Sequence, residues 1–60
     1  MKWSELRRIA EKKGWILHRH GSRHDIYKKK DGIEMIAIGR HDKEEIPKGT
    51  FSTLRKQIGF

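Results

Sequence analysis

The chain has 60 residues and no cysteine, and this combination most limits what it can fold into. A chain this short buries only about 60% of the surface that its unfolded form exposes. Because disulfides and thiolate metal sites are excluded, the core must be thin and built from a few large apolar side chains. We therefore expect Trp3, Trp15 and Phe51 to lie in the core, rather than on the surface as aromatic platforms for a ligand. Nothing indicates an oxidising compartment, so a cytoplasmic protein is expected.

The charge is strongly basic, with 15 lysines and arginines against 8 acidic residues and a formal net charge of +7. Such a surface attracts polyanions, of which RNA and DNA come first, followed by acidic proteins and membrane surfaces. A solvated basic surface without a specific ligand is the plainer alternative. No apolar run approaches the roughly 20 residues that span a membrane. Residues 1–8 do not resemble a signal peptide, so residue 1 is expected to begin the mature domain.

Two segments have helical periodicity. The first is predicted over 4–13, with Ser4 as its cap and Gly14 as its stop. The second is predicted to begin at a Thr50 cap and to end at Gly59. Their apolar positions are Leu6, Ile9 and Ala10 in the first and Phe51, Leu54 and Ile58 in the second.

Three strands are predicted between the helices, over 15–20, 24–29 and 33–38. Residues 21–23 form a short loop, and Asp31-Gly32 predicts a two-residue hairpin turn with positive φ at both positions. This turn sets the register of the second and third strands. The predicted pairs are Lys29–Glu34, Lys28–Met35, Tyr27–Ile36, Ile26–Ala37 and Asp25–Ile38.

Alternation along the strands separates two faces of the sheet. The face predicted to meet the helices carries Leu17, Tyr27, Ile36 and Ile38. The opposite face carries His24, Ile26, Lys28, Met35 and Ala37, which forms an exposed apolar patch beside basic groups, a typical binding surface. The order helix, three antiparallel strands, helix predicts one α+β domain over residues 1–60, with both helices on one face of the sheet. Double-stranded-RNA-binding domains share this order.

Four histidines, at positions 18, 20, 24 and 41, are the most reactive groups in the chain. His18 and His20 project from one face of a regular strand, and His24 could join them as a metal ligand, although no cysteine or well-placed acid supports a metal site. Alternatively, a histidine removes the 2′-hydroxyl proton of RNA as that oxygen attacks the adjacent phosphate. Nearby Arg and Lys would then stabilise the transition state, and no metal or other cofactor is required. An isolated surface histidine has neither role.

The segments Gly21-Ser22-Arg23-His24 and Gly39-Arg40-His41 resemble the HicA family, the small toxins of bacterial HicA–HicB toxin–antitoxin pairs. The start at 2–8 and the stretch 46–60 are also similar to that family. The resemblance covers essentially the whole chain, and its specificity comes from the order, spacing and total length of these short motifs. It implies a double-stranded-RNA-binding-like fold, metal-independent cleavage of mRNA, and inhibition by a HicB antitoxin that covers the active surface.

The resemblance assigns catalysis to the histidine of the Gly-Ser-x-His segment, which is His24 here. Many members also carry histidine at the position of Arg23, so a second acid in this chain must be His20, His41 or solvent. Members often have proline where this chain has Gly39, a difference expected to loosen the loop.

Roles for the neighbouring residues follow from their chemistry. Arg23, Lys28 and Arg40 are expected to contact phosphate. Ser22 has no identifiable base, so a turn hydroxyl is expected rather than a nucleophile. Gly21 permits the turn.

Two other functions use the same features. A non-catalytic RNA-binding domain would hold structured RNA by shape and phosphate contacts. A protein-interaction module would dock an acidic partner on the apolar sheet face. Cleavage of RNA distinguishes the enzyme from the non-catalytic RNA-binding domain. Affinity for RNA at low salt distinguishes both of these from the protein-interaction module.

Overall fold

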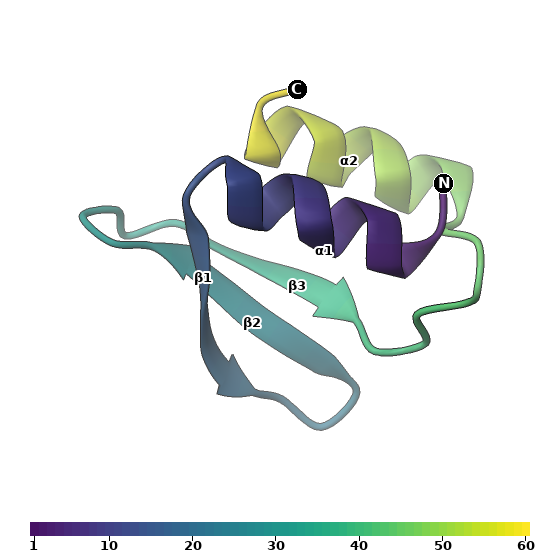
Figure 1. Ribbon diagram of the computed structural model, residues 1–60, viewed down its shortest axis with the longest axis horizontal. Helices are drawn as coiled ribbons and strands as arrows, with labels where there is room; N and C mark the ends of the chain where they lie inside the picture. Colours follow the sequence, from purple (N-terminus) through teal and green to yellow (C-terminus); the bar gives the residue numbers. More distant parts are fainter.

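The structure, a computed structural model that describes residues 1–60, consists of two helices and one three-stranded sheet (Figure 1). In chain order these are α1 (Trp3–Lys12), β1 (Trp15–His20), β2 (His24–Lys29), β3 (Met35–Gly39) and α2 (Lys48–Ile58). The order and the α+β class are as predicted. Gly14 and Gly59 have φ values of 95° and 92° after the two helices, so both predicted stop signals are confirmed.

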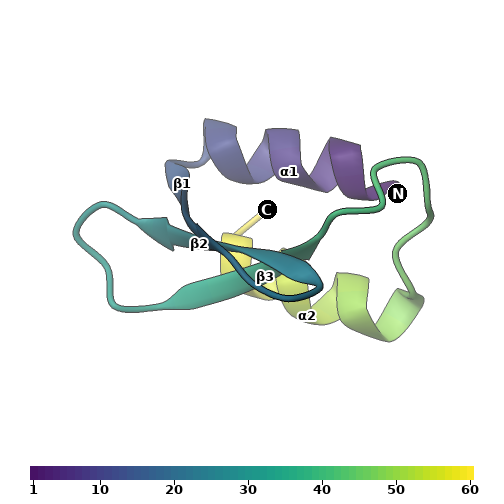
Figure 2. The same cartoon turned by 90° about the horizontal axis from the view of Figure 1, so that it is seen from below.

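The core lies between the helices and one face of the antiparallel sheet, whose strand order is β1-β2-β3. Tyr27, Ile36 and Ile38 supply the buried sheet face. Residues of both helices pack on it, so the helices share one face of the sheet, as Figure 1 and the view from below in Figure 2 show. The complete core cluster is Trp3, Leu6, Ala10, Trp15, Tyr27, Ile36, Ile38, Ile46, Leu54 and Ile58. Phe51 packs against its border.

The β2–β3 register confirms four predicted pairs, from Lys28–Met35 to Asp25–Ile38. The predicted two-residue turn is wrong: β3 begins at Met35, and Ile33 is 93% exposed. Gly32 does not have the positive φ that a primed turn requires, and its N–H instead bonds the carbonyl of Lys29. The predicted Lys29–Glu34 pair is absent from the ladder, because β3 begins only at Met35. The Lys29 side chain lies over the Trp15 ring, with Nζ 5.3 Å from the ring centroid. The chain therefore joins the strands through a wider loop.

Strand β1 contains an irregularity that the alternating pattern did not predict. The register shifts between Leu17 and Arg19, so His18 is an extra, unpaired residue. Leu17 pairs with Tyr27 but is 43% exposed, so its predicted place in the core is wrong. It lies on an edge strand that the helices leave uncovered beyond Trp15. The shift also brings His20 opposite Asp25, so His18 and His20 do not follow the simple alternation that would put them on one face.

Both helices start before the predicted cap residues, and at α1 a distant part of the chain satisfies the first N–H groups. Ser4 lies inside α1, where its N–H and that of Trp3 donate to the carbonyls of Asp42 and Glu44. The Lys2 N–H donates to the Glu5 carboxylate at 3.0 Å. Thr50 likewise lies inside α2, which begins after Pro47. Neither helix is long and apolar enough to cross a membrane.

The outer face of the sheet carries the predicted apolar patch in part. Met35 and Ala37 are exposed, and Ile26 is half-buried. Ile16, which pairs with Lys28, adds a further side chain that is 56% exposed. An apolar surface next to basic residues is therefore present on the face opposite the helices.

Candidate active site around His24

His24 begins β2 and pairs with Gly39 at the end of β3. Its neighbours Asp25 and Tyr27 alternate with it: Asp25, like Tyr27, is buried, whereas His24 is exposed and lies on the outer face. Both predictions for His24, its place at the start of a strand and on the face away from the helices, are confirmed.

Three surface depressions meet at His24. The first, of about 520 Å³, lies at the end of the sheet and is lined by Trp3, Ser22, Arg23, His24, Gly39, Arg40 and His41. The second, of about 560 Å³, runs between β3 and α2, and the third, of about 240 Å³, lies on the outer sheet face. His24 lines all three. Its ring therefore lies where an extended polymer could reach it along more than one path.

The first depression collects two cationic side chains and two imidazoles, from the β1–β2 loop, β2 and the segment after β3. Arg23 and Arg40 can hold a phosphate, and the imidazoles of His24 and His41 can serve as acid or base. The structure thus brings Arg23 and Arg40 to His24, as predicted. Lys28 does not line this depression; it borders a separate one with Ile16 and His18, four residues along the strand from His24.

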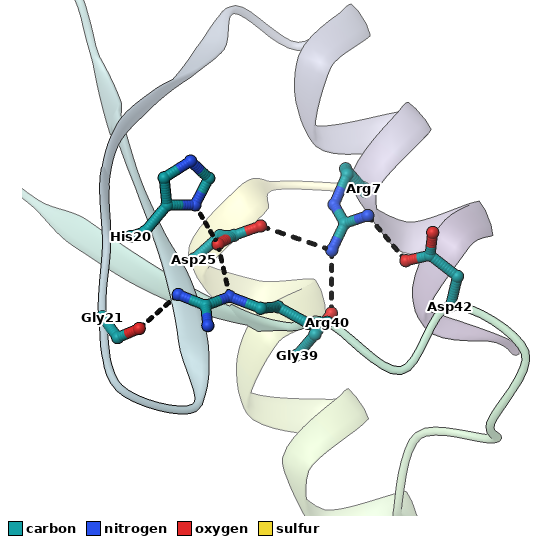
Figure 3. Close-up of polar contacts among 7 residues, drawn as sticks. All are labelled: Arg7, His20, Gly21, Asp25, Gly39, Arg40 and Asp42. Atoms are coloured by element: carbon teal, nitrogen blue, oxygen red, sulfur yellow. Dashed lines mark hydrogen bonds and ion pairs between the residues drawn. The ribbon is translucent and has the colours of Figure 1, made fainter.

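A buried carboxylate lies directly behind His24. The Asp25 side chain is 12% exposed and contacts polar side chains from three elements (Figure 3). His20 Nδ1 and Arg40 Nε both bond Asp25 Oδ1, at 2.7 and 2.9 Å. Arg7 Nη2 lies 3.7 Å from Asp25 Oδ2. The carboxylate therefore joins α1, β1 and the segment after β3.

Arg7 ties α1 to the same end of the sheet. Its Nη2 donates to the Gly39 carbonyl at 2.9 Å, and its Nη1 donates to Asp42 Oδ1 at 2.6 Å. These contacts fix the chain on both sides of Arg40 and His41. The sequence reasoning missed Arg7, Asp25 and Asp42. One signal was available, because the predicted register placed charged Asp25 opposite Ile38 on the apolar face, where a carboxylate needs partners.

Hydrogen bonds from Arg40 and then His20 hold the pKa of Asp25 below its ordinary value of 3.8. Because this folded pKa lies below the unfolded one, ionised Asp25 stabilises the folded chain at every pH above about 4. That contribution disappears as the pH falls through the folded pKa. We expect the urea midpoint to fall on acidification below pH 4, and to fall less in Asp25→Asn over the same range. Parallel curves for the two proteins would contradict this.

Gly39 is a packing position rather than part of a loosened loop, so that expectation is wrong. It is buried within β3, and a Cβ there would lie 2.8–3.1 Å from three ring carbons of Trp3. The Trp3 indole therefore occupies the space where a side chain would be and forms a wall of the depression.

Gly39→Ala should force the Trp3 ring to move and destabilise the fold by about 1–3 kcal/mol, the usual effect of overpacking. Urea denaturation followed by tryptophan fluorescence measures it. Gly49→Ala is the control, because it makes the same change at a position where a Cβ meets nothing within 4 Å. Equal stability of the two variants would show that the indole adapts without strain.

Fold and site together define a small basic α+β domain whose exposed sheet end presents histidines and arginines around one depression. The profile of the family described as the HicA toxin of bacterial toxin–antitoxin systems matches residues 3–60. The chain therefore belongs to the HicA toxin family. A search of curated proteins found no match.

Proposed function

We propose that this toxin is a cytoplasmic endoribonuclease that cleaves mRNA without a metal ion, with His24 as general acid or base. The observation that carries the proposal is the first depression, where exposed His24 lies with Arg23, Arg40 and His41. These groups suffice for transfer of a phosphoryl group to a neighbouring hydroxyl: a base, a second histidine and cations for the phosphate.

In the proposed reaction, His24 takes the proton of the RNA 2′-hydroxyl. The 2′-oxygen forms a bond to the adjacent phosphorus, the bond from phosphorus to the 5′-oxygen breaks, and a proton is added to the leaving oxygen. The products are a 2′,3′-cyclic phosphate and a free 5′-hydroxyl. Arg23 and Arg40 contact the phosphate as negative charge grows in the transition state. Lys28, farther along the outer face, contacts a phosphate of a neighbouring nucleotide.

His41 is the favoured proton donor for the leaving oxygen. It lines the depression with His24, whereas His20 does not line it and has its Nδ1 engaged by Asp25. We expect His41→Ala to lower kcat by about 10²-fold, the lower end of general acid–base contributions, and to remove the basic limb of the pH–rate profile. An unchanged profile would instead favour solvent as the donor.

The apolar patch on the outer sheet face supports binding of a HicB-type antitoxin. Met35, Ala37 and Ile16 are exposed there, and the third depression connects this face with His24. A protein that covers the patch also blocks RNA from His24. RNA and antitoxin should therefore compete for binding.

The proposal is tested by incubating the purified protein with single-stranded RNA in excess chelator. We expect cleavage with cyclic-phosphate ends, and no cleavage at a nucleotide that carries a 2′-deoxy substitution, because the attacking oxygen is then missing. Binding without cleavage would favour the alternative function, a non-catalytic RNA-binding domain. Cleavage of the 2′-deoxy substrate would exclude the proposed chemistry.

A further inference from the structure

Arg40 connects two segments that meet at His24. It follows Gly39, the residue that pairs with His24, and its guanidinium extends back across the sheet end. Nε donates to Asp25 Oδ1 at 2.9 Å, and Nη2 donates to the Gly21 carbonyl (Figure 3). The Gly21 N–H in turn donates to the His24 carbonyl at 2.7 Å. The loop that carries Ser22 and Arg23 is thus closed by hydrogen bonds at its base.

We propose that Asp25 and Arg40 form a bridge that positions the Gly21–His24 loop, and with it the His24 imidazole, for reaction. Arg40 is in this view a positioning residue as well as a phosphate contact. A guanidinium has five N–H groups, and the bridge uses two of them, which leaves three for a phosphate. The inference deepens the proposed function, since its catalytic consequence rests on cleavage by His24.

The geometry requires arginine rather than any cation. A planar guanidinium can donate to a carboxylate and a carbonyl at the same time, in fixed directions, whereas the lysine ammonium is a single point charge on a flexible stem. The bridge can fix the position of the Gly21–His24 loop only if the Asp25 carboxylate is itself held in place. Arg7 and His20 do this, because Arg7 lies beside the second carboxylate oxygen and His20 shares the first.

The loop is held at its base by few hydrogen bonds, so loss of the bridge should loosen it. A Cβ at Gly21 would lie 2.8 Å from the His24 carbonyl oxygen, so the two residues are already in close contact. Without Arg40, the only loop bond at this point is the one from Gly21 to His24. A displacement of about 1 Å at a reacting group can reduce a rate by roughly 10²-fold, so a loosened loop should lower kcat more than affinity.

The bridge is tested first without RNA. NMR hydrogen exchange measures protection of the Gly21 amide in the parent, in Asp25→Asn, and in Arg40→Lys and Arg40→Gln. We expect about tenfold or faster exchange at Gly21 in all three variants, with core amides such as Ile38 changed far less. Arg55→Lys is the matched control, because it makes the same change at an exposed arginine of α2 whose side chain has no hydrogen bond or ion pair. Its Gly21 exchange should equal that of the parent.

Activity provides the second measurement. We expect Arg40→Lys to lower kcat by about tenfold or more while KM changes less than about threefold, because charge is kept and the bridge is lost. Arg55→Lys should keep the parent kcat. If Arg40→Lys retains both Gly21 protection and kcat, Arg40 acts as a cation alone and the bridge is wrong.

The two proposals can fail separately. A parent protein that does not cleave RNA would overturn the ribonuclease, while the exchange measurement would still decide the bridge. If Asp25→Asn does not fold, Arg40→Lys and Arg40→Gln carry the test, since the Arg40 side chain is 39% exposed and lies outside the core. Unchanged Gly21 exchange in both folded variants would overturn the bridge.

Discussion

Replacing His24 with alanine is expected to slow RNA cleavage by about 10²–10⁴-fold, the usual contribution of a general acid or base. The exposed side chain makes no hydrogen bond or ion pair with the rest of the protein, so its removal leaves the fold intact. The surrounding cations remain, and RNA should still bind at low salt. Single-turnover cleavage and filter binding on the same RNA measure the two effects.

His18→Ala is the matched control. His18 is another exposed histidine on the sheet, but it lines the depression beside Lys28 and not the one that contains His41. Its loss should leave the cleavage rate within about threefold of the parent, because it lies outside the depression that contains His24 and His41. If both variants cleave at the parent rate, His24 has no catalytic role, and another base must be sought.

The largest effect on stability is expected from Leu6→Ala. Leu6 is fully buried at the centre of α1, and truncation of such a side chain costs about 2–5 kcal/mol. A core in a chain of this size supplies only about 3–5 kcal/mol of net stability. The variant should therefore be largely unfolded at 37 °C. Circular dichroism during thermal denaturation measures the loss.

Leu17→Ala tests whether the loss of stability on truncating a leucine depends on its burial. The alternating pattern predicted Leu17 in the core, but the structure leaves it 43% exposed on the edge strand. Its truncation should change stability by only about 0.5 kcal/mol, as for ordinary surface substitutions. A loss as large as that of Leu6→Ala would place Leu17 in the core after all.

Patterns between neighbours in the sequence predicted most of the fold. Helical periodicity located α1 and α2, and Gly14 and Gly59 marked where they end. Alternation over β2 and β3 predicted the buried face and four strand pairs correctly, because a shift of one residue would have exposed Tyr27, Ile36 and Ile38. The histidine of the Gly-Ser-x-His segment was placed at the start of β2 for the same reason.

Contacts between distant segments could not be read in this way. The N–H groups at the start of α1 bond the carbonyls of Asp42 and Glu44, so a local cap at Ser4 was unnecessary. The extra residue His18 in β1 depends on how the strand lies against β2. Gly39 was interpreted as a loosening substitution because nothing in the local sequence shows that Trp3 packs on it.

The sequence by itself determined the order of the helices and strands and the basic charge, since these depend on residue type and on spacing along one segment. The candidate catalytic histidine, His24, was selected by the resemblance to the HicA family. Only the tertiary structure showed that Asp25 lies behind His24 with Arg7, His20 and Arg40 around it. These side chains come from α1, β1, β2 and the segment after β3. A buried carboxylate is stable only where partners converge on it, and that convergence is a property of the packed chain.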